Sequence, residues 1–139
     1  MTVFVDTGVF YAHHDTDAER HDRAVELMES VLDGKYGVPY TSEYVVNEAV
    51  TLTRRRTRSV ESATTIGRRI LGAEPFPSVF ELVTLDADDV ETGWRTFQRF
   101  SDHDLSFTDA VSISLCDSRG IDSIMSFDSD FDGLLERIH

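Results

Sequence analysis

Short apolar runs along the chain predict the strands of a buried sheet. The run VFV at 3–5 is continuous and ends at Asp6, as a parallel strand covered on both faces does. The β-rich segment VFELVTL predicts a second strand at 79–85, and SIMSF predicts a third at 123–127. The tract GVPY at 37–40 is too short to assign, and the last residues are expected to add a short helix or an edge strand.

Apolar positions at helical spacing predict helices between these runs. Gly34 and Gly72 mark two helix ends, and the cluster of aspartates after Leu85 suits a helix N-terminus. Strands separated by helices predict a single domain over 1–139, an α/β fold built as a three-layer α/β/α sandwich on a mostly parallel sheet. The helices are expected at about 17–32, 42–56, 60–71, 86–100 and 106–119.

Aromatic residues repeat along the expected 86–100 helix. Trp94, Phe97 and Phe100 follow helical spacing, which predicts that they belong to the core rather than to a platform for nucleobases. Cys116 is the only cysteine and lies in an apolar helical stretch, so we expect an inert small hydrophobic residue there.

The charge balance is strongly acidic. Thirteen basic residues against 26 acidic ones give the 139-residue chain a net charge of -13, which by itself argues against a nucleic-acid partner. Sixteen of the acids are Asp and Lys35 is the only lysine, a composition that predicts a halophilic source. With one cysteine, no signal-like N-terminus and no long apolar run, we expect a cytoplasmic protein without membrane contact.

The positive charge is concentrated in one part of the chain. Residues 35–74 hold seven basic and four acidic side chains, whereas both flanking segments are acidic. These basic residues either form a solvated helix C-terminus or contact phosphate or a protein partner through their guanidinium groups. The centre of this stretch is RRRTR, which contains Arg54, Arg55, Arg56 and Arg58.

Four acidic residues stand in positions that point to chemistry. Asp6 and Asp128 follow predicted strands, and the carboxyl ends of parallel strands form the functional edge of such a sheet. Glu48 lies in the apolar helical stretch YVVNEAVTL, where an unpaired buried carboxylate is costly. Asp109 lies near the start of the 106–119 helix. Helix caps and turns explain an isolated aspartate equally well.

If these four carboxylates converge, they need a cation, because their mutual repulsion forbids the fully ionised state. Oxygen ligands without cysteine or histidine select Mg²⁺, with Mn²⁺ as an alternative, over Zn²⁺. Such a metal lowers the pKa of bound water and stabilises the charge on a phosphodiester under in-line attack. The residues therefore predict metal-dependent hydrolysis of phosphodiester bonds.

The order of these motifs resembles the PIN-domain ribonucleases. VDTG, a downstream helical glutamate, SFTDA and SFDSDF follow one another across the chain, and the set is most similar to the VapC-type toxins of toxin–antitoxin pairs. The resemblance implies a Mg²⁺-dependent endoribonuclease with an RNA substrate, an antitoxin partner and a homodimeric state. It implies a catalytic and metal-binding quartet of Asp6, Glu48, Asp109 and Asp128, with Asp6 and Asp109 as direct ligands, and a substrate or partner role for Thr7 and Ser126.

The fourth acid has an alternative. SFDSDFD offers Asp128, Asp130 and Asp132, and the position at the end of a strand favours Asp128, with Asp130 as the other candidate. Asp104, five residues before Asp109, is expected to be a loop residue rather than part of the site.

Three other functions fit the residues less well. A non-catalytic PIN module that binds RNA or a protein does not need an intact quartet. A phosphoacceptor receiver domain needs a lysine near its last strand, and the only lysine is Lys35. A dehalogenase-like phosphatase needs an aspartate two residues after its nucleophile, where this chain has Gly8.

Overall fold

The computed structural model describes the whole chain, residues 1–139, and contains one five-stranded sheet in which every strand runs parallel to its neighbours. The strand order is β3-β2-β1-β4-β5, so β1 is central. Val3 of β1 pairs with Pro39 on one side and with Ser123 on the other. The strands are β1 (Thr2–Val5), β2 (Val38–Ser42), β3 (Glu81–Val83), β4 (Ser123–Met125) and β5 (Arg137–Ile138).

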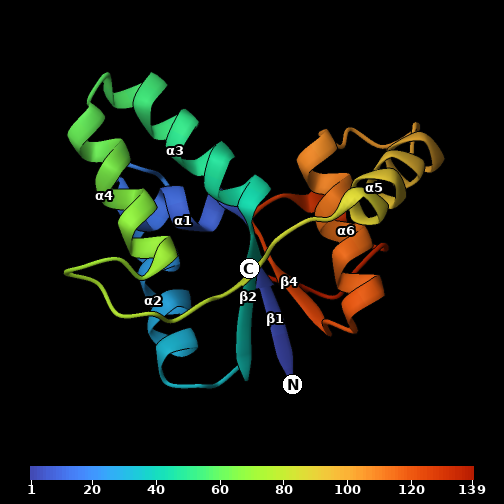
Figure 1. Ribbon diagram of the computed structural model, residues 1–139. Helices are drawn as coiled ribbons and strands as arrows, with labels where there is room; N and C mark the ends of the chain where they lie inside the picture. Colours follow the sequence, from blue (N-terminus) through green and yellow to red (C-terminus); the bar gives the residue numbers. More distant parts are fainter.

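Helices cover both faces of this sheet, as Figure 1 shows. α1 to α4 lie on one side of the strands and α5 and α6 on the other, which confirms the predicted three-layer architecture. None of these helices has the length and apolar character that a membrane crossing requires. The helices are α1 (Thr7–His14), α2 (His21–Leu32), α3 (Glu43–Thr57), α4 (Val60–Leu71), α5 (Ala87–Arg99) and α6 (Phe107–Arg119), with a short 3-10 helix at Ser129–Phe131.

β1 is apolar because helices pack on both of its faces. Val3, Phe4 and Val5 are fully buried. They belong to one core of 21 buried residues, which also contains Leu27 of α2 and Leu115 of α6. Burying each such side chain contributes about 1.5 to 3 kcal/mol. The core therefore holds the end of β1, where the first acidic residue stands, in a fixed place.

Side-chain caps fix where α3 and α6 begin. At the start of α3, Oγ of Ser42 accepts a hydrogen bond from the N–H group of Val45. At the start of α6, Ser106 and Asp109 each accept a hydrogen bond from the backbone N–H group of the other. Both helices start at the carboxyl edge of the sheet, so the caps position Glu48 and Asp109 there.

The structure corrects several predicted boundaries. The tract at 37–40 belongs to strand β2, and the chain ends in the edge strand β5. The strands expected at 79–85 and 123–127 are shorter than predicted, and the helix expected from Asp17 begins at His21.

The sequence pattern does not predict α1. Five of its eight residues are buried, and they follow one another with little interruption. A helix that is covered on nearly every side has no polar face, so it lacks the period by which amphipathic helices are recognised.

The predicted burial of the α5 aromatic residues is wrong for Trp94, which is 52% exposed. Phe97 and Phe100 are half-buried. α5 is an outer helix, in which only Asp89 and Gly93 are fully buried, so its aromatic face is only partly covered.

Cys116 is buried as predicted, and burial raises the pKa of its thiol to about 12.

α5 packs closely against α6. Arg119 of α6 donates hydrogen bonds of 3.0 and 2.8 Å to the two carboxylate oxygens of Asp89. A Cβ atom at Gly93 would lie 2.6 Å from Cγ2 of Val111 and 3.3 Å from its Cα. The absence of a side chain at Gly93 therefore permits the close approach of the two helices.

We expect Gly93→Ala to destabilise the fold by about 1 to 3 kcal/mol, because the added methyl group overlaps the buried Val111 side chain. Gly8→Ala is the matched control, since Gly8 also lies in a helix and a Cβ there meets no heavy atom within 4 Å. Urea unfolding measures both free energies. Equal stability of the two variants would contradict the close packing of α5 on α6.

Candidate active site

The structure brings the four predicted acids to the carboxyl edge of the sheet. Asp6 follows β1, Asp128 follows β4, Glu48 lies in the second turn of α3 and Asp109 in the first turn of α6. Burial raises the pKa of Asp6, and the charges of Asp109 and Glu48 add to this effect. Burial also raises the pKa of Asp109, to which the charges of Asp128 and Glu48 contribute. The four carboxylates are therefore close enough to repel one another.

Asp6 is the most deeply buried member of the group, with 6% of its surface exposed. Its Oδ2 accepts a 2.8 Å hydrogen bond from Oγ of Ser126, whereas its Oδ1 is buried without a hydrogen-bond partner. Burial raises the pKa of Asp6 to about 7, against the lowering effect of the Ser126 hydrogen bond. One oxygen of this carboxylate is thus free to receive a proton or a cation.

Ser126 connects the two acids at the strand ends. Its Oγ donates to Asp6 and accepts a 3.0 Å hydrogen bond from the backbone N–H group of Asp128. Ser126 is fully buried, so these two bonds fix the orientation of the Asp6 carboxylate. Thr7, the other predicted hydroxyl residue, is also buried, and its Oγ1 has no hydrogen-bond partner. Both hydroxyl groups are therefore shielded from solvent, and Ser126 is the one that bonds to Asp6.

Asp109 has a structural role as well as a place in the acid group. Its Oδ2 accepts a 2.9 Å hydrogen bond from the N–H group of Ser106, and its own N–H group donates to Oγ of Ser106 at 3.1 Å. The capping interpretation of Asp109 is thus confirmed. The cap is compatible with a place in the acid group, because it holds the buried Asp109 carboxylate beside Asp6.

The structure favours Asp128 over Asp130 as the fourth acid. Asp128 is half-buried. The pKa of Asp109 is raised mainly by burial and further by the charge of Asp128, whereas Asp130 does not contribute to that shift. Oδ1 of Asp128 accepts a 2.9 Å hydrogen bond from the N–H group of Asp130. The pKa of Asp130 is raised mainly by the charge of Asp128, with a smaller contribution from the exposed Asp104. Asp130 and Asp104 therefore lie outside the group.

Glu48 differs from expectation because it is half-buried rather than buried. It forms neither a hydrogen bond nor an ion pair, and it lines a hollow together with Thr51, Thr108 and Arg55. Glu48 therefore stands at the side of the acid group, where solvent or substrate reaches it.

The donor set fits a magnesium ion held mainly by water. No three His, Cys, Asp or Glu side chains are arranged to hold a metal ion by themselves. Mg²⁺, however, keeps several water ligands and is commonly bound by one or two carboxylates. Asp6 and Asp109 offer two buried carboxylates, and Oδ1 of Asp6 lacks any other partner. Asp128 and Glu48, in contrast, are only half-buried.

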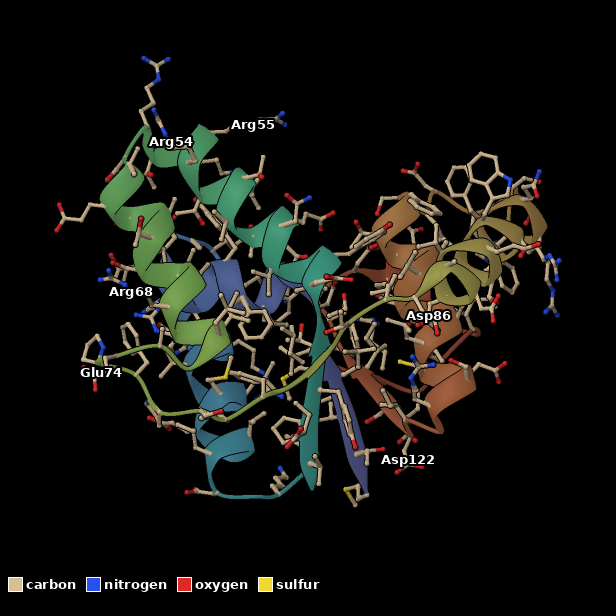
Figure 2. The ribbon with its side chains drawn as sticks, in the orientation of Figure 1. Arg54, Arg55, Arg68, Glu74, Asp86 and Asp122 are labelled. Atoms are coloured by element: carbon tan, nitrogen blue, oxygen red, sulfur yellow. The ribbon has the colours of Figure 1, made fainter.

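The four predicted arginines separate into two pairs. Arg55 lines the hollow beside Glu48, and Arg56 lines a second hollow, in which its guanidinium lies 4.7 Å from the ring centroid of Tyr11. Arg54 and Arg58 line neither hollow. Figure 2 shows Arg54 and Arg55 leaving the far end of α3 in different directions. Arg55 thus lies beside one acid of the site, whereas the hollow of Arg56 contains none of the four acids.

The structure adds one basic residue that the sequence analysis missed. Arg20 lines the second hollow with Arg56, and its guanidinium lies 5.4 Å from the ring centroid of Phe127, next to Asp128. Arg20 lies in a stretch of mixed charge with Glu19, Asp22 and Arg23, so no local pattern connects it with the site.

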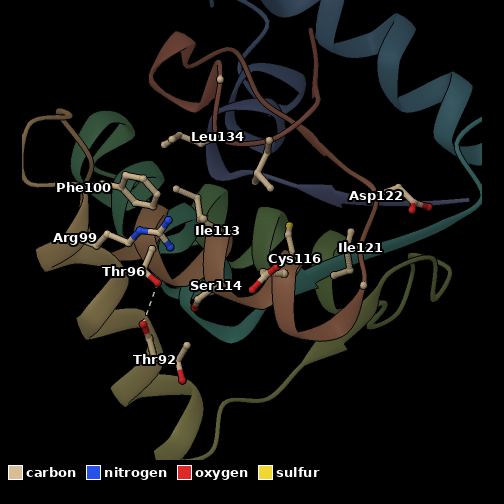
Figure 3. Close-up of a pocket in the computed structure, with 14 residues that line it drawn as sticks. Thr92, Thr96, Arg99, Phe100, Ile113, Ser114, Cys116, Ile121, Asp122 and Leu134 are labelled. Atoms are coloured by element: carbon tan, nitrogen blue, oxygen red, sulfur yellow. Dashed lines mark hydrogen bonds between the residues drawn. The ribbon is translucent and has the colours of Figure 1, made fainter.

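The largest cavity lies away from the acids. It has a volume of about 610 Å³ and is bounded by α5, the C-terminal end of α6 and the segment before β5. Figure 3 shows Thr96, Phe100, Cys116 and Leu134 around it, with Asp122 at one end. Asp122 precedes β4, so this cavity faces the opposite edge of the sheet from the acids.

Comparison with known proteins places this geometry in a family. The model of the PIN domain matches residues 3–134. The 23S rRNA-specific endonuclease VapC20 of Mycobacterium tuberculosis is 30% identical over 129 residues, which cover 93% of this chain and 91% of that protein.

Solved structures agree with this assignment. The crystal structure of Mycobacterium tuberculosis VapC20, described as a sarcin-ricin loop cleaving toxin, has a TM-score of 0.80 at 29% identity, with 93% of this chain and 92% of that chain covered. VapBC2 from Rickettsia felis, bound to a DNA fragment from its promoter, has a TM-score of 0.69 at 12% identity and coverages of 99% and 98%. A toxin–antitoxin complex from Klebsiella pneumoniae has a TM-score of 0.61 at 12% identity, with coverages of 99% and 96%. The latter two support the fold alone.

The family model covers nearly the whole chain, and the acids occupy the carboxyl edge of a fully parallel sheet. The chain belongs to the PIN-domain family.

Proposed function

We propose that this protein is a metal-dependent endoribonuclease, the toxin of a toxin–antitoxin pair, and that it hydrolyses phosphodiester bonds of RNA. The observation that carries the proposal is the buried Asp6 carboxylate, which has one oxygen without a partner and whose pKa is raised by burial and by the charges of Asp109 and Glu48. The 30% identity to an rRNA-specific endonuclease over most of both chains supports RNA as the substrate class.

Burial and contacts assign a different role to each residue of the proposed site. Asp6 and Asp109 would hold Mg²⁺ or Mn²⁺, and the bound ion supplies an acidified water and charge stabilisation at the phosphate. Ser126 holds the Asp6 carboxylate in one orientation through its 2.8 Å hydrogen bond. Glu48 and Asp128 are half-buried, so each can accept a proton from water at the rim of the site.

Arg55 and Arg56 supply the positive charge that an acidic protein needs beside a polyanion. Both are exposed. Arg55 lines the hollow that contains Glu48, and Arg56 lines a hollow that contains Phe127, the residue before Asp128. Guanidinium groups bind phosphate oxygens in a bidentate manner, so these two residues are suited to the RNA backbone on either side of the reacting phosphate.

The antitoxin is proposed to cover this same edge. Two solved structures with this fold contain toxin–antitoxin partners, which supports a partner protein for this chain. An antitoxin that blocks the acids would use the arginine-lined hollows as its contacts. The homodimer and the halophilic source stay predictions from the sequence.

A non-catalytic PIN module that only binds RNA or protein is the second candidate. The intact acid group disfavours this candidate, because four mutually repelling carboxylates are a cost that a purely binding surface does not require.

We expect Asp6→Asn and Asp109→Asn each to lower the rate of RNA cleavage by at least about a hundredfold, because each variant loses a carboxylate that holds the ion. Asp130→Asn is the matched control, since Asp130 lies outside the group, and it should cleave at the rate of the unaltered protein. Gel assays with mixed RNA, in EDTA and then with Mg²⁺ or Mn²⁺ restored, measure these rates. Cleavage that persists in EDTA or in Asp6→Asn would overturn the metal-dependent mechanism.

We expect Arg55→Gln to weaken RNA binding and to reduce the salt dependence of the binding constant by about 0.7 in the log–log slope, the value for one lost phosphate contact on a single strand. Arg54→Gln removes the same charge from a side chain that lines neither hollow, so it should have a much smaller effect. Filter binding over a range of salt concentrations checks this expectation. Equal effects of the two variants would show that only net charge matters.

A further inference from the structure

We propose that Arg137 is a positioning residue of the acid site, because its guanidinium group holds both ends of the loop that carries Ser126 and Asp128. Residues 126–132 are called the acid loop below. The inference rests on the proposed function and deepens it. Arg137 bonds to the loop rather than to any of the four acids, so it acts on the reaction through the groups that the loop presents.

The acid loop begins at Ser126, whose backbone is held by the edge strand β5. The N–H group of Ser126 donates a 3.0 Å hydrogen bond to the carbonyl oxygen of Ile138. The carbonyl oxygen of Ser126 accepts a 3.2 Å hydrogen bond from Nη1 of Arg137. β5 therefore fixes the residue whose hydroxyl group bonds to Asp6 and to the N–H group of Asp128.

The same guanidinium group holds the other end of the acid loop. Nε and Nη2 of Arg137 donate hydrogen bonds of 2.6 and 3.0 Å to Oδ1 and Oδ2 of Asp132. A planar guanidinium that meets both oxygens of a carboxylate fixes its direction as well as its distance. One side chain thus joins the first and last residues of the loop, an arrangement that we call the Arg137 clamp.

Burial separates the Arg137 clamp from the other ion pairs of the chain. The Arg137 side chain is 11% exposed, whereas Arg23 and Arg95 in their pairs with Glu26 and Glu91 are 46% and 73% exposed. Exposed pairs of this kind contribute little to stability. Burying a guanidinium also carries a desolvation cost that an apolar side chain on an edge strand would avoid. Stability alone therefore does not account for Arg137, whereas the need for one fixed loop geometry does.

The charge of Arg137 also reaches an acid of the site. Its hydrogen bonds to Asp132 are the largest cause of its raised pKa, and the charge of Asp128 adds to that rise. Arg137 and Asp128 are thus close enough to attract each other. This attraction offsets part of the repulsion between Asp128 and Asp109, whose pKa the charge of Asp128 helps to raise.

The clamp affects the rate of reaction rather than the affinity for RNA. Ser126 orients the Asp6 carboxylate, so a shift of the acid loop moves a ligand of the proposed ion as well as Asp128. A displacement of about 1 Å at reacting groups lowers the rate by about a hundredfold. Loss of the clamp therefore lowers kcat, while KM depends on other residues.

The first test separates these two constants in the full chain with Mg²⁺ and a short mixed-sequence RNA. Arg137→Gln should lower kcat by about ten- to a hundredfold and leave KM within about twofold. Glu26→Gln is the matched control, since it breaks the exposed pair with Arg23 on α2 and should change neither constant. An unchanged kcat for Arg137→Gln, or a loss confined to KM, would overturn the clamp.

The second test needs neither metal nor RNA. Amide hydrogen exchange, measured by NMR in the metal-free protein, reports on the hydrogen-bonded N–H groups of Ser126 and Asp128. In Arg137→Gln both should exchange at least about tenfold faster, while the amides of the central strand β1 keep their rates. Unchanged exchange at Ser126 and Asp128 would contradict the positioning role. So would an equal acceleration in β1, which is the sign of a general loss of stability.

Asp132→Asn decides the question if Arg137→Gln does not fold. The Asp132 side chain is 56% exposed, so the variant leaves the core intact, keeps the shape of the side chain and removes the charge that holds the guanidinium. Both the fall in kcat and the faster exchange at Ser126 and Asp128 should appear, each smaller than in Arg137→Gln. Wild-type values of both quantities in Asp132→Asn would overturn the clamp.

Failure of the clamp and failure of the proposed function give different results. If the unaltered protein shows Asp6-dependent cleavage while Arg137→Gln keeps its kcat, the clamp fails and the proposed function stands. If the unaltered protein never cleaves RNA, the proposed function fails, and the exchange measurement still decides whether Arg137 holds the acid loop.

Discussion

The Asp6 carboxylate is held out of water at the end of the central strand, and the rest of the site is arranged around this constraint. β1 is covered on both faces, so the residue that follows it has no freedom to move into solvent. Ser126 satisfies one of its oxygens and leaves the other without a partner. Burial and the neighbouring carboxylates together make the ionised form unfavourable, which is why the pKa of Asp6 rises to about 7.

This unfavourable charge links stability to ligand binding. Because folding raises the pKa of Asp6, the metal-free fold loses stability as the pH rises from about 4 to about 7. Under the proposed function, a divalent cation at the free oxygen would remove that loss, so binding of the ion would stabilise the fold. The proposed function also changes the meaning of the net charge of -13, since part of that charge would then belong to a cation site rather than to a surface that repels RNA.

The sequence was sufficient to find the acids, because strand ends and helix starts are visible in the hydrophobic pattern. It favoured Asp128 over Asp130 from the position at the end of a strand, but it could not show the buried Ser126 hydroxyl, which accepts a hydrogen bond from the Asp128 N–H group. It also could not divide Arg54 from Arg55, since their separation depends on where α3 faces α6. Trp94 shows the same limit, because helical spacing reveals a shared face but not whether another element covers that face.

The most direct test of this account is the pKa of Asp6 itself, measured by NMR titration of its carboxyl carbon in the metal-free protein and again with saturating Mg²⁺. We predict a value of about 7 without metal. With Mg²⁺, we predict that the carboxylate stays ionised well below that pH. A pKa near the ordinary value of aspartate in the metal-free protein, or one that Mg²⁺ leaves unchanged, would contradict the claim that a buried, uncompensated carboxylate organises the site.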